Sequence, residues 1–470
     1  KEFYEISDQL NIELIKVKQQ GEARCEGLSY QDLLNDETIE VPAYLRENTN
    51  PFMGDDDLDV ARWVDRDFHE QEKKKLWPKV WQMTCREEDI PEIGDHHVYE
   101  IVDQSIIVTR TGENEIKAFI NSCLHRGRIL RDCDGHAEEF VCPFHGATWS
   151  IKGEFKAIPC KWDFSHLDQK DMSLPQVKVG IWGGFIFINF DENCVPLEDY
   201  LSPLPEHFAR FPLHDYYKGA HVERVVQCNW KVGAEAFMES FHTLETHSEI
   251  LTFTGDANSQ YDTFGDHVSR SVTPMGVASP HRPDVTAEET MRDILVLSGR
   301  MATDSAEGHE VPKGVTARTY VAETNREMFG DIIGQPLDDA TQTELEDAIL
   351  YMLFPNTQVW IGYHGNIVYR FLPNGDDHSS CIFETMILMR YPKGTKRPEP
   401  AMKNTLRPDQ AFSEAPEIGA LGPVFDQDDS NMAAVQKGMI ASRKGAVSLA
   451  SYQESRIRHL HQTIDKYLKA

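Results

Sequence analysis

Two short Cys/His pairs constrain this chain more tightly than any other feature of its sequence. The first is Cys123-x-His125 and the second is Cys142-x-x-His145, with sixteen residues between His125 and Cys142. Together they offer two thiolates and two imidazoles from two similar loops. This donor set suits either a tetrahedral zinc ion or a [2Fe–2S] cluster in which two His replace two Cys on one iron. In both cases the loops have to meet, so we expect this region to fold as one unit.

The spacing within the pairs separates these two options. Zinc sites more often use C-x-x-C knuckles, whereas a C-x-H pair and a C-x-x-H pair, each followed within two residues by glycine, resemble the Rieske cluster motif. Gly127 and Gly146 make physical sense there, because close backbone approach lets amide N–H groups reach the cluster sulfurs. We therefore expect the four side chains to hold a Rieske [2Fe–2S] cluster, with zinc as the alternative.

A second set of metal-type side chains, Glu239, His242 and His247, lies within nine residues. On a helix, Glu239 and His242 share a face, but His242 and His247 are five apart at ~100° per residue and point away from each other. The helix must therefore bend or end between them. Two imidazoles on a broken helix suit one divalent metal with a more distant third ligand. Taken alone, such a pair is more often two ordinary histidines beside a solvated glutamate.

Length and charge narrow the class of protein. A chain of 470 residues is expected to form two or three domains, and its net charge of −30 repels phosphate backbones, which excludes nucleic acid as a partner. The longest apolar run, 179–190, is broken by glycines and too short to cross a bilayer as a helix. No basic-then-apolar leader opens the sequence, and the nine cysteines at irregular spacing indicate reduced thiols. We expect a cytoplasmic protein without a membrane segment.

The sequence divides into three segments of an α+β protein. Residues 1–77 are expected to form an N-terminal helical arm that packs with the catalytic domain and contains a helix over 57–77. Residues 78–192 are expected to form a small all-β cluster domain. Its predicted strands are 98–102, 105–110, 116–120, 148–151 and 177–190.

Residues 193–470 are expected to form the catalytic domain, a large antiparallel sheet wrapped by helices in the helix-grip manner. The Gly-, Pro-, Asp- and Ser-rich stretch 251–345 predicts long loops. A final amphipathic helix within 449–467 is expected to dock on this domain or on a neighbouring subunit. The predicted strands are 221–226, 351–354, 358–362, 367–372 and 380–389.

Three acids near the C-terminus extend the second metal motif. The stretch 425–438 predicts a helix that opens with acids at its positive end. Asp426, Asp428 and Asp429 cannot all cap that helix. One of them is therefore free to face the two histidines as a metal carboxylate.

Two metal motifs in this order resemble the large (α) subunit of the Rieske non-heme iron ring-hydroxylating oxygenases, over roughly residues 60–470. The resemblance implies that His242, His247 and Asp428 bind mononuclear Fe(II) as a two-His-one-carboxylate triad, with Asp429 as the fallback ligand. It also implies that Glu239 bridges an iron-ligating His of its own subunit to His145 of the neighbouring subunit. Electrons would then pass between the subunits of a homotrimer.

The function implied by the resemblance is that of an oxygenase component. It would use O2 and electrons from a ferredoxin or flavin reductase to cis-dihydroxylate or monooxygenate an apolar ring substrate, with or without a small β subunit. The alternatives are an O- or N-demethylase or monooxygenase acting on a larger terpenoid or steroid-like compound, and a zinc-stabilised binding protein without redox activity. Cationic residues near the cluster loops form either a solvated face or a docking patch for an acidic electron donor: Arg126, Arg128, Arg131, Lys152 and Lys156.

Overall fold

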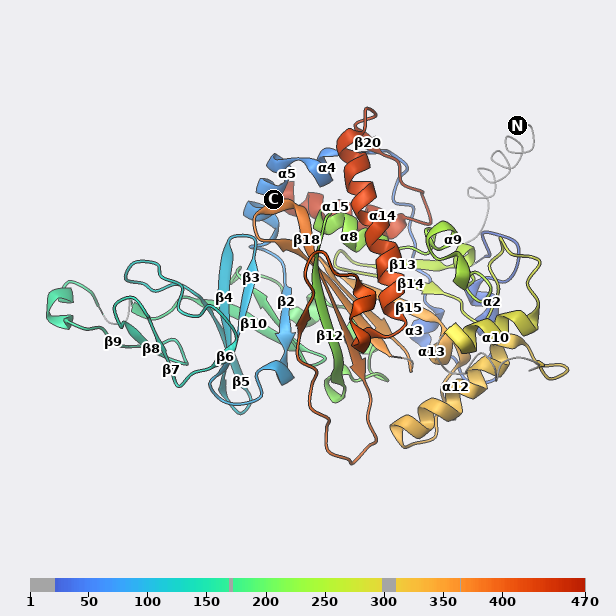
Figure 1. Cartoon of the computed structure of the whole chain (residues 1–470), viewed down its shortest axis with the longest axis horizontal. Coiled ribbons are helices and arrows are strands. Elements are labelled where there is room, and N and C mark those ends of the chain that lie inside the picture. The colour runs from blue at the N-terminus through green and yellow to red at the C-terminus, as the bar shows by residue number, and fades with distance from the viewer. Residues whose placement is uncertain (1–21, 169–171, 298–309, 364, 470) are drawn as a thin grey trace.

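The structure, a computed structural model, describes residues 22–168, 172–297, 310–363 and 365–469. The first 21 residues of the predicted N-terminal arm, and residues 298–309 of the predicted long loops, lie outside the described residues. The described elements form two β-rich bodies that lie side by side (Figure 1). Helices from both ends of the chain cover one edge of the larger body.

The smaller body is the predicted all-β module. It combines a seven-stranded sheet of order β2-β11-β10-β5-β4-β3-β6 with a three-stranded sheet of order β7-β8-β9. The predicted strand over 177–190 is two strands, because Gly183 and Gly184 adopt positive φ and turn the chain into a hairpin. The strands are β2 (Gln82–Arg86), β3 (Asp95–Ile101), β4 (Gln104–Gly112), β5 (Glu115–Ile120), β6 (Gly135–His136), β7 (Glu139–Val141), β8 (Thr148–Ser150), β9 (Phe155–Ala157), β10 (Gln176–Trp182) and β11 (Phe185–Asn189).

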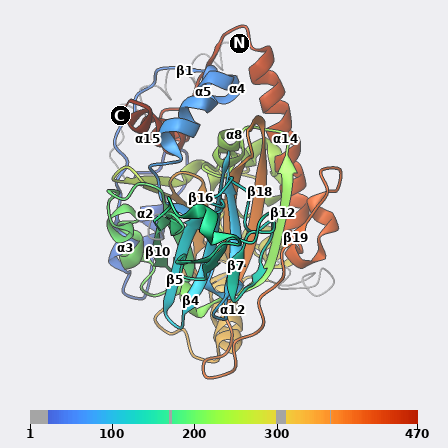
Figure 2. The ribbon, with the colours of Figure 1, turned by 90° about the vertical axis from the view of Figure 1, so that its left-hand side faces the viewer.

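The larger body confirms the predicted antiparallel sheet. Its eight strands follow the order β13-β14-β15-β16-β17-β18-β12-β19, and only the short β12–β19 pair is parallel. Seen from the smaller body, the two sheets lie one behind the other (Figure 2). The strands are β12 (Tyr217–Val226), β13 (Gln260–Phe264), β14 (Val268–Thr273), β15 (Ala348–Leu353), β16 (Thr357–Ile361), β17 (Asn366–Asn374), β18 (Asp377–Met389) and β19 (Asn404–Thr405).

The prediction of long loops over 251–345 is wrong. Two of the sheet strands fall there, and so do the helices α10 (Ala287–Leu297), α12 (Ala317–Ile333) and α13 (Gln342–Glu346). Helix α12 buries one apolar stripe against its neighbours, and the buried Arg318 pairs with Asp347 at 2.6 Å. The polar residues that dominate this stretch hid that stripe, which only its packing partners make stable.

The arm helix predicted over 57–77 is broken into short pieces. The side chain of Asp65 accepts hydrogen bonds from the backbone N–H groups of Asp67 and Phe68, which starts a new helix inside the predicted one. A further turn is π-helical, and the first residues pair as a short strand with residues near the C-terminus. The elements are α2 (Tyr30–Asn35), α3 (Ala43–Arg46), β1 (Leu58–Asp59), α4 (Ala61–Val64), α5 (Arg66–Gln71), η1 (Glu72–Leu76) and β20 (Ala446–Val447).

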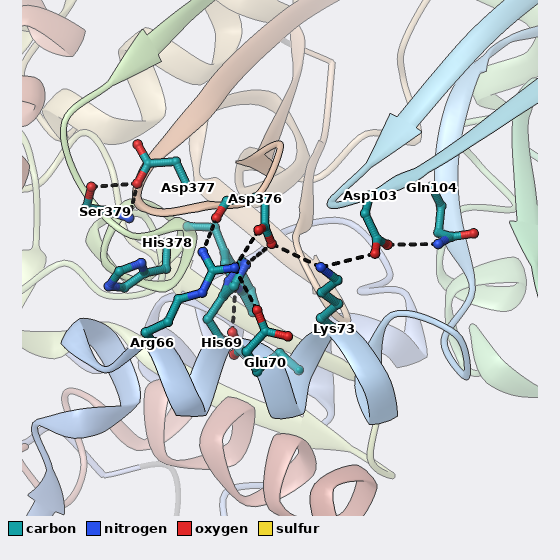
Figure 3. Close-up of polar contacts among 12 residues, drawn as sticks. Arg66, His69, Glu70, Lys73, Asp103, Gln104, Asp376, Asp377, His378 and Ser379 are labelled. Carbon is teal, nitrogen blue, oxygen red and sulfur yellow. Dashed lines mark hydrogen bonds and ion pairs between the residues drawn. The ribbon is translucent and has the colours of Figure 1, made fainter. Parts of the chain in front are cut away.

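Three parts of the chain meet at Asp376, in the turn between β17 and β18 (Figure 3). Arg66 of α5 pairs with its carboxylate, and Lys73 of η1 approaches it to 3.3 Å. Lys73 also lies 3.0 Å from Asp103, in the β3–β4 turn of the smaller body. Hydrogen bonds from Arg66 and Lys73 lower the pKa of Asp376 to about 2. The groups are partly exposed, so each pair contributes little stability, but together they connect the N-terminal helices to a turn of each body.

The remaining helices complete the larger body. Helix α15 buries Ile457, Leu460 and Ile464 against the catalytic sheet, which confirms the predicted docking of the C-terminal helix on this domain. None of the described helices is long and apolar enough to span a membrane. These helices are α6 (Leu197–Tyr200), α7 (Leu204–His207), α8 (Trp230–Ala236), α9 (Thr243–Thr246), α14 (Leu421–Ala441) and α15 (Ser455–Lys469).

Candidate metal centres

The two Cys/His loops have the same backbone conformation. In each, the glycine N–H donates to the cysteine carbonyl four residues earlier, at 2.8 Å for Gly127 to Cys123 and 2.9 Å for Gly146 to Cys142. The N–H of each cysteine in turn donates to the carbonyl oxygen of the residue five positions later, at 2.8 Å in both loops. Both glycines have φ of 76°, a conformation that side chains disfavour. The short sequence repeat thus folds into a structural repeat.

The side chains of these loops face one another. Cys123 and Cys142 are buried, and the rings of His125 and His145 lie 4.7 Å apart, edge to face. Burial raises the pKa of the Cys123 thiol, although the backbone N–H groups of His125 and Arg126 oppose this by pointing at the sulfur. The buried Nδ1 of His125 has no hydrogen-bond partner within the described parts of the chain, as expected for a nitrogen that binds a metal.

The spacing of these donors argues against zinc. Bonds of about 2.3 Å to one ion keep all four donors within roughly 4.6 Å of one another. Among the described residues, the only group of three or more His, Cys, Asp or Glu donors within 4.8 Å lies elsewhere in the chain. The loops therefore fit a larger, two-iron group better than a single ion.

Most of the cationic side chains near these loops have partners. Arg128 pairs with Asp132 at 3.1 Å, Lys152 lies 3.4 Å from Glu115, and Lys156 pairs with Glu139. The Arg131 guanidinium donates to the Glu139 carbonyl at 2.8 Å, and Arg126 stacks on Phe144. This favours a solvated, internally paired face over a free cationic docking patch.

The second motif forms the predicted broken helix. Helix α8 ends at Ala236, and the chain turns before the single-turn helix α9, which His242 and His247 flank at its two ends. The two rings face each other with centroids 5.2 Å apart. The break therefore brings together two side chains that a straight helix would point apart.

Helix α14 supplies the third member of this group. Its buried face carries Phe425, Asp428, Met432 and Gln436, at the spacing of one helical stripe. Asp428 Oδ1 lies 3.0 Å from His247 Nε2 and 3.7 Å from His242 Nε2. The donor atoms of His242, His247 and Asp428 all lie within 4.8 Å of one another.

The electrostatics of this group suit a cation. Burial disfavours the charged imidazoles, but hydrogen bonds and the charges of Glu239 and Asp428 outweigh it and raise the pKa of His242. Hydrogen bonds and the charge of Asp428 outweigh burial likewise and raise the pKa of His247. The site thus carries excess negative charge, which a divalent ion would neutralise.

Each histidine is held by a partner on the nitrogen that faces away from Asp428. His242 Nδ1 donates to Glu239 Oε1 at 2.8 Å, and His247 Nδ1 donates to Gln427 Oε1 at 2.7 Å. Because these oxygens only accept hydrogen bonds, the proton sits on Nδ1 and the Nε2 lone pairs are free for a metal. The sequence pattern indicates Glu239, whereas Gln427 has no local signal beyond its place next to Asp428.

The three C-terminal acids have separate roles. Helix α14 begins four residues before the predicted start, so these acids do not lie at its positive end, and that prediction is wrong. Asp426 accepts the backbone N–H groups of Phe412 and Ser413, and Asp429 pairs with Arg224. Only Asp428 of the three faces the histidines.

Family models match both parts of the chain. Residues 80–169 match the Rieske [2Fe-2S] domain, and residues 213–470 match the ring hydroxylating alpha subunit (catalytic domain). The chain therefore belongs to the ring-hydroxylating α-subunit family of oxidoreductases. It combines a Rieske [2Fe–2S] domain with a catalytic domain that binds mononuclear iron.

Curated relatives match the chain over part of its length. The α subunit of 2-aminobenzenesulfonate 2,3-dioxygenase from Alcaligenes sp is 29% identical over 195 residues, which is 39% of this chain and 48% of that protein. The large oxygenase component of naphthalene 1,2-dioxygenase from Pseudomonas putida is 31% identical over 199 residues, or 40% of this chain and 43% of that protein. The matched part of the chain spans about half the length of these relatives.

Solved structures share the fold. A naphthalene 1,2-dioxygenase variant bound to phenanthrene matches with a TM-score of 0.63 and 19% identity, covering 90% of this chain and 94% of that one. A quaternary ammonium Rieske monooxygenase in complex with L-carnitine matches with a TM-score of 0.60 and 17% identity, covering 87% and 95%. The α+β prediction, with a small β domain and a large helix-wrapped antiparallel sheet, is confirmed.

Proposed function

We propose that this chain is the oxygenase component of a multicomponent Rieske oxygenase, which uses O2 and external electrons to hydroxylate an apolar ring compound. The observation that carries the proposal is the pairing, in one chain, of a surface Cys/His loop pair with a buried two-His-one-carboxylate group. Three protein ligands leave part of an iron coordination sphere open for O2 and substrate, unlike a closed structural site.

The proposed ligands divide between the two centres. Cys123, His125, Cys142 and His145 hold the cluster, and His242, His247 and Asp428 hold the iron. When bound, these groups supply single-electron transfer and O2 activation. The chain itself orients the ligands through Glu239 and Gln427 and buries the carboxylate of Asp428.

An apolar substrate is supported by the aromatic side chains behind the iron ligands. Phe237 lies between α8 and the sheet, with its ring 4.7 Å from Tyr369 and 5.3 Å from Phe383. Phe425, one turn before Asp428 on α14, lies 5.2 Å from Phe383. We propose either dihydroxylation or monooxygenation of a neutral ring.

Product analysis with labelled O2 tests this reaction. The panel contains naphthalene, biphenyl, indole and larger terpenoid or steroid-like compounds, and a surrogate ferredoxin and reductase supply the electrons. Absence of any oxygenated product from a protein loaded with both metals would contradict the proposal.

Electron transfer is proposed to pass between subunits of a homotrimer, with or without a small β subunit. Within one chain, the β7–β8 loop, which carries His145, lies at the far end of the molecule from α9, the helix that His242 and His247 flank (Figure 1). The His145 ring is exposed, so it is available to another copy. Light scattering of the purified protein measures the assembly.

The role of Glu239 in this bridge is tested by Glu239→Gln. The amide oxygen still accepts from His242 Nδ1, so both metals are expected to remain bound while electron transfer from the reduced cluster slows at least about tenfold. Metal analysis and stopped-flow reoxidation of the cluster give the two readings. An unchanged multi-turnover rate would remove Glu239 from the electron path.

A further inference from the structure

A cavity of about 240 Å³ lies beside the proposed iron site. Helices α8 and α14 and the segment before α15 form its walls, and His242 and Asp428 form part of its surface. Most of the lining is apolar, yet three carboxyl groups besides Asp428 also face it: Glu235, Glu239 and Glu454. The cavity is large enough for several water molecules, since each needs about 30 Å³.

The proposed reaction needs protons at this place. Dihydroxylation combines the substrate with O2, two electrons and two protons, and monooxygenation uses the same set to give an alcohol and water. The electrons come from the external donor, whereas the protons must pass from solvent through the protein to the buried carboxylate of Asp428 and the two histidines beside it. Water molecules between acidic side chains are the usual route for such a transfer.

We propose that Glu235 and Glu454 are the proton-donating pair of this site and pass protons through cavity water to the space beside His242 and Asp428. This inference rests on the proposed oxygenase function. In each transfer an O–H bond of the carboxyl breaks, a neighbouring water takes the proton, and solvent water returns one to the carboxylate. Over a turnover, the two protons end in the hydroxyl groups of the diol, or in the alcohol and water.

The surroundings of Glu235 keep it protonated near neutral pH. Its carboxyl lies 2.9 Å and 3.0 Å from Trp63 Nε1 and 2.8 Å from His461 Nε2. Burial raises its pKa to about 8, against the opposing effects of the Trp63 hydrogen bond and of the charges on Lys231 and Arg62. Lys231 is itself neutralised by Glu72 at 2.7 Å.

Glu454, the residue immediately before α15, also has a raised pKa. Burial raises its pKa to about 7, opposed by a 2.6 Å hydrogen bond from the backbone N–H of Ala450. The charges of Glu239 and Glu235 raise the pKa further, and that of Arg458 lowers it. Exposed glutamates titrate near 4.3, so they hold no proton at this pH. An acid with a pKa near the working pH is the most effective donor.

Replacing each glutamate by glutamine tests the pair. The amide preserves an acceptor for Trp63 Nε1 or the Ala450 N–H but holds no transferable proton, so the fold and both metals should be retained. Infrared difference spectra of the wild-type holoenzyme should show two protonated carboxyl bands that titrate between roughly pH 6 and 9, the pKa range set by burial. Glu454→Gln should remove one band and Glu235→Gln the other.

Kinetics provide the second reading. The reduced enzyme is mixed with O2 and with the panel compound that gives product, without further electron donor, so that it turns over once. Under these conditions Glu454→Gln should slow substrate oxidation about tenfold, and the variant with both glutamates replaced should slow it about 100-fold. The solvent deuterium isotope effect should rise, and Glu454→Asp should restore part of the rate. Glu399→Gln, which removes a carboxylate that is 86% exposed, is the matched control with no expected effect.

The outcomes are distinguishable from failure of the oxygenase itself. Absence of product from the wild type with both metals bound would overturn the oxygenase proposal, whatever the infrared bands show. Product formation by the double variant at the wild-type rate, or absence of both titrating bands, would overturn the proton-donating pair alone.

Discussion

The two metal centres are built in opposite ways. Each cluster loop is closed by its own backbone, with the cysteine and glycine of one loop hydrogen-bonded within six residues. The iron site instead joins His242 and His247, which follow the helix break after α8, to Asp428, which lies 181 residues beyond His247. The first centre presents an exposed histidine at the end of the molecule, and the second buries its carboxylate. An electron-accepting group benefits from exposure, whereas O2 chemistry benefits from a site that is shielded from bulk solvent.

The largest effect is expected when a proposed cluster ligand is removed. Cys142→Ala is expected to abolish cluster binding, because a [2Fe–2S] centre needs all four protein ligands. The iron site should stay intact, since its ligands share no element with the loops. Visible absorption and iron analysis measure both. Loss of both metals would show that the two centres are not independent.

Asp428→Ala is the converse change. Because Asp428 is itself a proposed ligand, iron affinity should fall by more than about 100-fold, the upper limit usual for removing a residue that only hydrogen-bonds a ligand. The visible spectrum of the cluster should persist. Asp429→Ala is the matched control and should lose only its ion pair with Arg224. If Asp429→Ala releases the iron and Asp428→Ala does not, the assignment of the carboxylate ligand is wrong.

A smaller effect is expected at Gln427. In Gln427→Leu, the His247 ring loses the acceptor that fixes its Nδ1 proton, so iron affinity should fall about tenfold. Gln427→Glu keeps an acceptor in place and should retain iron. Isothermal titration with Fe(II) under anaerobic conditions measures both variants, and equal affinity in the leucine variant would contradict the positioning role.

The smallest effect compares the two cluster glycines. Both have φ of 76°, so either alanine variant should destabilise the fold by about 1–2 kcal/mol. A Cβ at Gly146 would also lie 3.2 Å from Pro159 Cγ, whereas at Gly127 its nearest neighbour is 3.9 Å away. Gly146→Ala should therefore lower the melting temperature more than Gly127→Ala. The reverse order would show that packing at Pro159 is relaxed in solution.

Sequence and structure differ most in the catalytic half. Strands with runs of β-branched and aromatic residues, such as β17 and β18, were predictable because such runs suit a buried sheet. Helices α10 and α12 were not, since the Gly-, Pro-, Asp- and Ser-rich sequence around them favoured loops and their apolar residues become informative only when packed. The domain limits at 77 and 192 remain predictions.

The sequence alone predicted the donor types of both proposed centres. The donor types proposed for the cluster at Cys123, His125, Cys142 and His145 follow from short spacings. The need for a break between His242 and His247 follows in the same way, because both depend only on backbone geometry over a few residues. Tertiary structure decided what lies far apart in the chain: that Asp428 and not Asp429 meets the histidines, that Gln427 holds His247, and that Glu235 and Glu454 share one cavity. Such contacts depend on how α8, α14 and α15 pack on the sheet, and no local pattern encodes that packing.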